Sequence, residues 1–123
     1  MPDRGIILFA HGARDARWAE PFHAVAARMR VARPDLLVSL AFLEHLEPDL
    51  AGALRHHAAA GVRNVRIVPL FFGRGGHLRE DFPAVLAAAR QSAPDVAVEV
   101  TEAAGESGAV QAALAAFALD RID

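Results

Sequence analysis

The chain has 123 residues, a formal net charge of −2 at pH 7 and no cysteine. This length predicts one domain, residues 1–123, and the 54% hydrophobic content excludes disorder as the main state, because disordered chains lack the apolar surface that offsets ordering entropy. Without cysteine, disulfides, iron–sulfur clusters, zinc thiolate sites and cysteine nucleophiles are excluded, so any metal must have nitrogen or oxygen ligands.

Charge and apolar patterning also predict partners and location. A weakly acidic chain has no global attraction for nucleic acid or anionic membranes. Its longest apolar stretches are far shorter than the roughly 20 residues that span a bilayer, and Asp3 and Arg4 interrupt the start of the chain where a signal peptide would be apolar. We therefore expect a cytoplasmic protein with neither a nucleic-acid nor a membrane partner.

Four short apolar runs predict β-strands. They cover residues 5–10, 36–43, 65–72 and 96–101. The first three are apolar on both faces, as interior parallel strands are, whereas the fourth alternates valine with smaller or polar residues and is predicted to be an edge strand. Pro69 donates no ladder hydrogen bond, so we expect local disruption near the end of the third run.

A stretch with helical period follows each run. Four residues are expected to face inward from each helix: Phe22, Val25, Ala26 and Met29; Leu50, Ala53, Leu54 and His57; Phe82, Val85, Leu86 and Ala89; Val110, Ala113, Leu114 and Phe117. Gly61 is placed to end the second helix, Asp81 to begin the third with Pro83 in its first turn, and Ser107 to begin the fourth.

This alternation of strand and helix predicts an α/β fold. Right-handed crossovers would give a single three-layer αβα domain, doubly wound and flavodoxin-like, with a four-stranded parallel sheet. Ligands in such sheets bind outside the carboxyl ends of the strands, so the residues that follow each strand are the first candidates for a site.

Three of these strand ends carry a potential metal ligand. Glu44 follows His11 by 33 residues, and His77 follows Glu44 by 33, one strand–helix unit each. If the first strand lies between the second and third, the three side chains converge. Two imidazoles and a carboxylate suit divalent cobalt, nickel, iron or zinc, and leave coordination positions for water or substrate. The alternative is that both histidines only bond nearby backbone.

Other candidates are weaker. His23, His56 and His57 are interpreted as structural or solvated, and His45 as either an outer neighbour of the site or a solvated loop residue. Trp18 either packs in the core or lines the pocket of a flat ligand.

Phosphoryl transfer and nucleotide binding are not expected. The segment Gly73-Arg74-Gly75-Gly76 is glycine-rich, but a phosphate-binding loop needs Gly-Lys-Ser/Thr at the start of a helix. Histidine phosphatases place an arginine directly before His-Gly, where this chain has Ala10.

Three segments carry a resemblance to a known family. LFAHGARD, AFLEHLEPDL and VPLFFGRGGHLREDFP resemble the small CbiX-type sirohydrochlorin chelatases over most of the chain. The third segment is the most specific, because it combines a strand, a glycine loop, a histidine and a helix cap. The resemblance implies a chelatase-like version of the α/β fold.

The resemblance also implies an activity. Class II chelatases insert a divalent metal, here cobalt first or else iron or nickel, into sirohydrochlorin for cobalamin or siroheme biosynthesis, without ATP. In the family, histidines matching His11 and His77 bind the metal, and an acidic residue matching Glu44 serves related chelatases. These three residues are therefore the predicted metal ligands and catalytic groups. The metal is a substrate, and no nucleotide cofactor is expected.

Metal insertion removes two pyrrole protons and exchanges water on the metal for ring nitrogens, so a base and a ligand are needed together. The carboxylates of the tetrapyrrole need cations, for which Arg14, Arg17, Arg74 and Arg79 are candidates, with solvated surface arginine as the alternative. Ala13 departs from the serine of many relatives, which removes a hydroxyl beside the first histidine.

Two further expectations concern turnover and assembly. The alternative function is a non-catalytic protein that binds or delivers metal or tetrapyrrole, and turnover discriminates the two. A homodimer is expected because larger relatives carry two such halves in one chain, and a symmetric partner can wall in a broad ligand.

Overall fold

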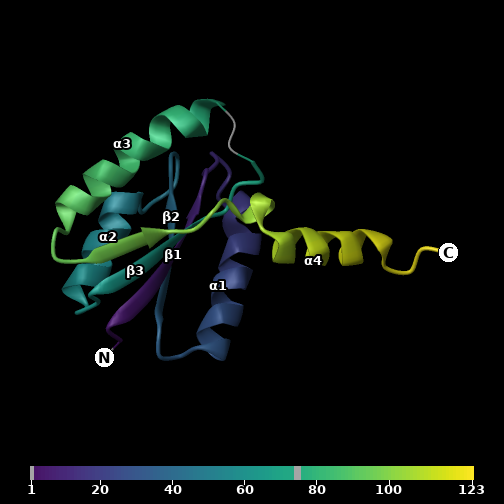
Figure 1. Cartoon of the computed structure of the whole chain (residues 1–123), viewed down its shortest axis with the longest axis horizontal. Coiled ribbons are helices and arrows are strands. Elements are labelled where there is room, and N and C mark those ends of the chain that lie inside the picture. Colours follow the sequence, from purple (N-terminus) through teal and green to yellow (C-terminus); the bar gives the residue numbers. More distant parts are fainter. Residues whose placement is uncertain (1, 74–75) are drawn as a thin grey trace.

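Four parallel strands form one sheet in the computed structural model, which describes residues 2–73 and 76–123, without the side chains of residues 76–79. The strands are β1 (Arg4–Ala10), β2 (Leu37–Phe42), β3 (Asn64–Pro69) and β4 (Ala97–Val100). Their order is β2-β1-β3-β4 (Figure 1), so β1 lies between β2 and β3, which is the condition for the three candidate ligands to converge, and β4 is an edge strand as predicted.

Four helices and two short 3₁₀ turns connect and follow the strands. The helices are α1 (Glu20–Ala32), α2 (Leu50–Ala59), α3 (Gly76–Ser92) and α4 (Gly108–Leu119), and the turns are η1 (Ala16–Ala19) and η2 (Ala104–Glu106). The Asp49 side chain begins α2 by accepting a hydrogen bond from the Gly52 amide at 2.8 Å, and Gly61 follows its end with φ +90°. Within the described residues, no helix is both long and apolar enough to cross a bilayer.

The crossovers place α2 and α3 on one face of the sheet and α1 on the other (Figure 1). On the α2/α3 face, Phe9 is fully buried and its ring lies 5.8 Å from that of Phe71 and 5.6 Å from that of Phe82. On the α1 face, Leu8 and Ala26 belong to a smaller buried cluster. The αβα prediction is therefore confirmed.

The third helix begins earlier than predicted. It starts at Gly76, five residues before Asp81, and Pro83 lies inside it instead of in its first turn. The segment before the aspartate contains leucine, arginine and glutamate, which favour helix. Proline removes only one intrahelical hydrogen bond, so the helix continues through it.

Two strand predictions need correction. The second strand is the other edge of the sheet, although its sequence has the pattern of an interior strand. Its residues are buried because α1 and α2 both contact β2 from opposite faces. The third strand ends at Pro69, short of the predicted Phe72, although the Leu70 amide still donates to the Phe9 carbonyl at 2.8 Å.

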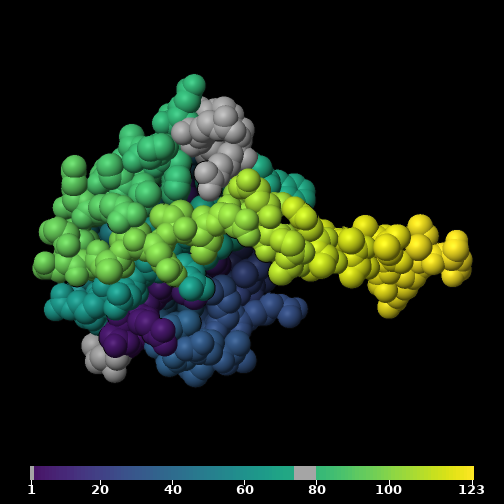
Figure 2. Space-filling view, viewed as in Figure 1, coloured from purple at the N-terminus to yellow at the C-terminus, as the bar shows by residue number. Residues whose placement is uncertain are grey.

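The fourth helix does not pack inward as its pattern predicts. Every residue of α4 is described and none is buried; Leu114 is 42% and Phe117 80% exposed. The helix extends away from the sheet, and Figure 2 shows it projecting beyond the rest of the molecule. Its start is fixed by the Ser107 side chain, which accepts from the Val110 amide at 3.4 Å. The amphipathic period predicts a buried face, but within the described residues nothing buries that face of α4.

Candidate active site at the carboxyl edge of the sheet

His11 and Glu44 follow the neighbouring strands β1 and β2 directly. Backbone hydrogen bonds continue past the strand ends: the Leu43 amide donates to the Ala10 carbonyl at 2.9 Å, and the Glu44 amide to the His11 carbonyl at 3.1 Å. Both side chains therefore leave the same edge of the sheet from adjoining backbone. The sequence spacing predicts this placement, and the structure brings the two residues together.

The two side chains contact each other at the carboxyl edge of the sheet. His11 Nδ1 lies 3.7 Å from Glu44 Oε1, with the side chains 39% and 45% exposed, and 3.3 Å from the Gly12 carbonyl oxygen. Two acceptors beside Nδ1 favour the tautomer with the proton on that nitrogen. In that tautomer the Nε2 lone pair is the one that a metal or a proton would take, and the carboxylate orients the ring. Solvent access keeps the site open to ligands.

A second imidazole approaches the same oxygen of the Glu44 carboxylate. His45 Nε2 is 3.9 Å from Glu44 Oε1, and His45 has φ +68°. This left-handed backbone is uncommon for residues other than glycine. Of its two predicted roles, the structure supports that of an outer neighbour of the site.

Gly12 is required by the close approach of these two loops. Its φ is +94°, and an added Cβ would overlap the Glu44 carbonyl oxygen. Only glycine fits without moving the loop that carries the carboxylate. Sequence reasoning missed this role, although a His-Gly pair directly after a buried strand is the signal that could have revealed it.

For the predicted third ligand, His77, the structure describes the backbone only. The backbone of His77 belongs to the first turn of α3, instead of the loop predicted for it, and its side chain is outside the described residues. Among the residues that are described, no group of three histidine, aspartate or glutamate side chains could hold a metal ion. Convergence of His77 with His11 and Glu44 therefore stays a prediction.

The four predicted carboxylate-binding arginines differ in placement. Arg14 is exposed on the loop after β1. Arg17 lies in η1 and its Nη2 is 2.8 Å from Asp15 Oδ2; this pairing lowers the pKa of Asp15 and raises that of Arg17. Arg74 lies outside the described residues, and so does the side chain of Arg79. One predicted cation thus already has a carboxylate partner.

The remaining described histidines lie on helices. His23 and His56 are exposed, whereas His57 is fully buried in α2 and its Nε2 lies 2.8 Å from Ser39 Oγ. Burial, with a smaller contribution from His56, lowers the pKa of His57 from 6.5 to about 4, so the ring is neutral at physiological pH. The structural interpretation of these residues is confirmed for His57.

Two aromatic side chains are exposed near the site. Phe72 follows β3 and is 72% exposed, although its run predicts a strand residue there. Trp18 is 36% exposed, and its ring lies 4.8 Å from that of Phe22, so it is neither core nor fully solvated. Exposed rings at the edge of a sheet are suited to contact a flat ligand.

The fold and the site together define a doubly wound α/β domain with an imidazole–carboxylate site at the carboxyl edge of its sheet. The CbiX family profile matches residues 5–120 of the chain. The chain therefore belongs to the CbiX family.

Curated relatives include the sirohydrochlorin cobaltochelatases of Methanococcoides burtonii and Methanosarcina acetivorans, 32% and 30% identical over 82 residues. These matches span 67% of this chain and 63% of each relative.

Among solved structures, a CbiX protein from Marinobacter aquaeolei VT8, provisionally assigned to cobalamin (vitamin B12) biosynthesis, superposes with a TM-score of 0.81 at 30% identity, over 94% of this chain and 93% of that one. The sirohydrochlorin chelatase SirB from Bacillus subtilis subspecies spizizenii, in complex with cobalt, has a TM-score of 0.74 and covers 98% of this chain and 51% of its own; at 22% identity it supports the fold alone.

Proposed function

We propose that this protein inserts a divalent metal into sirohydrochlorin without nucleotide hydrolysis, with cobalt as the first candidate and iron or nickel as alternatives. The observation that carries the proposal is the contact between His11 and Glu44 at the carboxyl edge, in a chain of the CbiX family. The names of the curated relatives support sirohydrochlorin as the substrate and cobalt as the metal.

The His11–Glu44 pair supplies the two chemical functions that insertion needs. The imidazole binds the incoming metal or accepts a pyrrole proton through Nε2, while the carboxylate holds the opposite ring nitrogen. Because a protonated imidazole can do neither, activity is expected to fall as the pH is lowered. His77 is proposed as the second metal-binding imidazole.

The rim offers both apolar and charged contacts for a broad, carboxylate-rich macrocycle. Phe72 presents an exposed ring beside the end of β3, and Arg14 an exposed guanidinium beside the end of β1. Sirohydrochlorin binding should therefore weaken with salt, and Arg14→Ala and Arg74→Ala should raise KM. Salt-independent binding with unchanged kinetics in both variants would leave apolar stacking as the source of affinity.

The direct test is a spectral assay of sirohydrochlorin with the purified protein and each metal separately. His11→Ala and His77→Ala should each abolish insertion, and Glu44→Gln should slow it, while circular dichroism stays unchanged. His56→Ala is the matched control, because this exposed histidine is the seventh residue of α2 and lies toward the amino ends of the strands. Full insertion rates in the His11 and His77 variants contradict the proposal. Stoichiometric binding of metal or tetrapyrrole without turnover indicates a delivery protein instead.

We further infer that the working unit is a homodimer. In a single copy, the side chains of His11 and Glu44 at the carboxyl edge are 39% and 45% exposed. A macrocycle bound there would be covered by protein on one side only. Light scattering at micromolar concentration tests the assembly, and a stable monomer with full activity would show that one copy suffices.

A further inference from the structure

The short turn η1 is held at its start by a single carboxylate. Asp15 lies just before the turn, and its Oδ1 accepts a hydrogen bond from the Arg17 amide at 2.9 Å. The Arg17 guanidinium donates to both oxygens of the same carboxylate, from Nε to Oδ1 at 3.1 Å and from Nη2 to Oδ2 at 2.8 Å. The Trp18 amide donates to the Asp15 carbonyl at 3.0 Å. We call these contacts the Asp15–Arg17 clamp, and they fix the backbone of η1.

The clamp contributes little to the stability of the fold. The side chains of Arg17 and Asp15 are 82% and 56% exposed, so solvent screens their attraction. A two-pronged contact between arginine and a carboxylate is nonetheless specific in geometry, because the planar guanidinium meets both oxygens in a narrow range of orientations. The effect of the clamp is therefore on the position of the residues that it holds.

Trp18 is the side chain that this turn carries. Its ring lies 4.8 Å from that of Phe22, at an interplanar angle of 53°, and the residue is 36% exposed. The next residue, Ala19, is buried, so the turn is held at its start by Asp15 and at its end by the core. The result is a large aromatic ring on a fixed backbone, with part of its surface open to solvent.

The turn lies at the same edge of the sheet as the candidate site. His11 follows β1 directly, and η1 completes the same connection before α1 begins at Glu20. Figure 1 shows α1 starting at the carboxyl end of β1 and running back along the sheet, as the helix between two parallel strands does. Trp18 therefore belongs to the edge that carries the His11–Glu44 pair.

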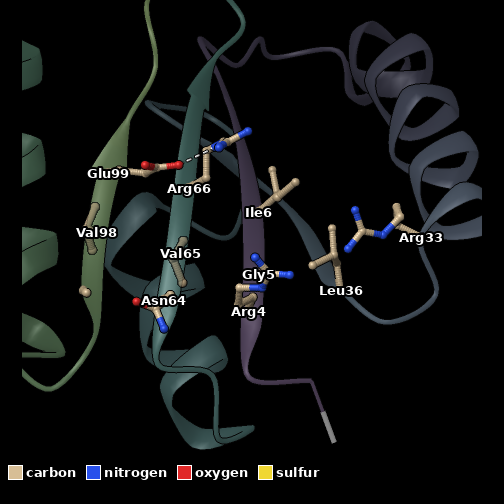
Figure 3. Close-up of a pocket in the computed structure, with 11 residues that line it drawn as sticks. Arg4, Gly5, Ile6, Arg33, Leu36, Asn64, Val65, Arg66, Val98 and Glu99 are labelled. Carbon is tan, nitrogen blue, oxygen red and sulfur yellow. Dashed lines mark hydrogen bonds and ion pairs between the residues drawn. The ribbon is translucent and has the colours of Figure 1, made fainter.

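A groove of about 580 Å³ lies at the opposite end of the sheet. Figure 3 shows it crossing the amino ends of β1, β3 and β4. Its charged side chains are Arg4, Arg33, Arg66 and Glu99, and the last two pair with each other. None of the described residues that line it is aromatic. The groove can receive polar groups, but a flat aromatic ligand finds a ring to stack on at the carboxyl edge instead.

We propose that Trp18 is a substrate-binding residue whose indole stacks on the face of the tetrapyrrole, and that the Asp15–Arg17 clamp holds the indole in place. This inference rests on the proposed function, for which it names the aromatic contact. Arg17 is then a positioning residue instead of a cation that binds a carboxylate of the substrate. Of the two roles that the sequence predicts for Trp18, this one is the lining of a flat ligand's pocket.

Physical arguments favour a fixed indole at this edge. Tryptophan has the largest aromatic surface of any side chain, and offset stacking adds attraction beyond the burial of apolar area. A ring on a fixed backbone loses little conformational freedom when the ligand binds. Metal insertion also requires a defined orientation of the macrocycle relative to His11, which a rigid contact maintains better than a mobile one.

Sirohydrochlorin binding without metal tests the aromatic contact, because it requires no turnover. Titration followed by the absorbance of the macrocycle measures the dissociation constant. Trp18→Ala should weaken binding about tenfold, and Trp18→Phe should recover most of the loss because it restores a ring. Val31→Ala is the control, since Val31 is 85% exposed in the last turn of α1, at the other end of that helix, and should bind like wild type.

A double-mutant cycle separates a clamp from a cation that binds substrate directly. Arg17→Ala should weaken binding several-fold in the wild-type background. In the Trp18→Ala background it should have no further effect, because the ring that the clamp positions is absent. If Arg17 itself binds a carboxylate of the substrate, the two losses should add, and that result overturns the positioning role.

Asp15→Ala gives opposite signs for the two roles of Arg17. The substitution removes a negative charge and frees the guanidinium, so an arginine that binds substrate directly should then bind it more tightly. If Arg17 acts through the clamp, binding should weaken instead, because both the hydrogen bond and the ion pair that fix η1 are lost. Tighter or unchanged binding overturns the clamp.

The fluorescence of Trp18 reports on the clamp without any ligand, because the chain contains one tryptophan and no tyrosine. Arg17→Ala and Asp15→Ala should lower the fluorescence anisotropy of Trp18 and increase its quenching by acrylamide, since the turn becomes mobile. Val31→Ala should leave both signals unchanged. Equal anisotropy and quenching in all of these proteins contradict the clamp.

The remaining outcomes separate this inference from the proposed function. A wild-type protein that binds no sirohydrochlorin overturns both. Equal binding by wild type and Trp18→Ala overturns the aromatic contact alone. Circular dichroism and light scattering are recorded for each variant, and a changed fold or oligomeric state in Trp18→Ala would make the ring structural and overturn the proposal. The Arg17→Ala and Asp15→Ala variants keep the indole and test the clamp independently.

Discussion

The two faces of the sheet are built from the same strands but are completed differently. On the α2/α3 face, Phe9, Ile67 and Leu54 are fully buried, and two helices close the layer. On the α1 face, Val68 and Leu70 stay only partly buried because one helix covers only part of the layer. Because successive side chains of a strand point to opposite faces, both faces of the sheet can be apolar. Each face is buried only where a helix packs against it.

Two adjacent residues of β3, Ile67 and Val68, point to opposite faces and test the difference between the faces most directly. Ile67→Ala should lower the free energy of unfolding by about 3 kcal/mol, because it opens a cavity in a closed layer. Val68→Ala should cost about 1 kcal/mol, because solvent already reaches that side chain. Urea unfolding at low protein concentration measures both, and equal losses would contradict the difference between the faces.

The covered face also contains the one buried histidine of the described residues, and this predicts a pH dependence of stability. The folded pKa of His57 is about 4 against 6.5 for an unperturbed imidazole, so the unfolded chain binds the proton first as the pH falls between these values. Stability from this group is therefore present above pH 6.5 and is lost by about 2 kcal/mol on approaching pH 4. His57→Gln should flatten that part of the profile.

His23→Gln provides the control for the acid profile, because His23 is exposed and its replacement should leave the slope unchanged. An identical slope in wild type and His57→Gln would assign the acid sensitivity to the carboxylates instead.

At the carboxyl edge of the sheet, Gly12→Ala should have a moderate effect on stability and a large effect on the proposed activity. The substitution strains a position with φ +94° and displaces the backbone of Glu44, at a cost of about 1 to 3 kcal/mol. The His11–Glu44 contact should be lost, and the proposed metal insertion with it. Gly73→Ala is the control, since an added Cβ there meets no atom within 4 Å. Unchanged insertion in Gly12→Ala would argue against a role for the contact.

The smallest effect is expected from the ion pair on the open face. Arg66 and Glu99 are 55% and 63% exposed, so solvent screens their attraction, and Glu99→Gln should change the free energy of unfolding by less than about 1 kcal/mol. A double-mutant cycle with Arg66→Gln measures the pair. A coupling energy well above this value would mean that the groove is covered in solution.

The sequence by itself determined the strand–helix alternation, the αβα class and the placement of His11 beside Glu44. Local periodicity and strand-end position carry this information, because both are properties of residues near one another in the chain. The same local information could not place β2 at an edge, since an edge strand covered on both faces has the composition of an interior one. Nor could it show that α3 begins at Gly76 and passes through Pro83.

Only the tertiary structure decided what α4 does. The spacing of Val110, Leu114 and Phe117 makes one face of the helix apolar, which is why the sequence predicts that this face packs inward. The direction of the helix depends instead on how η2 packs against the backbone of Phe72, a contact between residues more than thirty positions apart in the chain. Periodicity defines which side of a helix must be covered, but long-range packing decides which surface covers it.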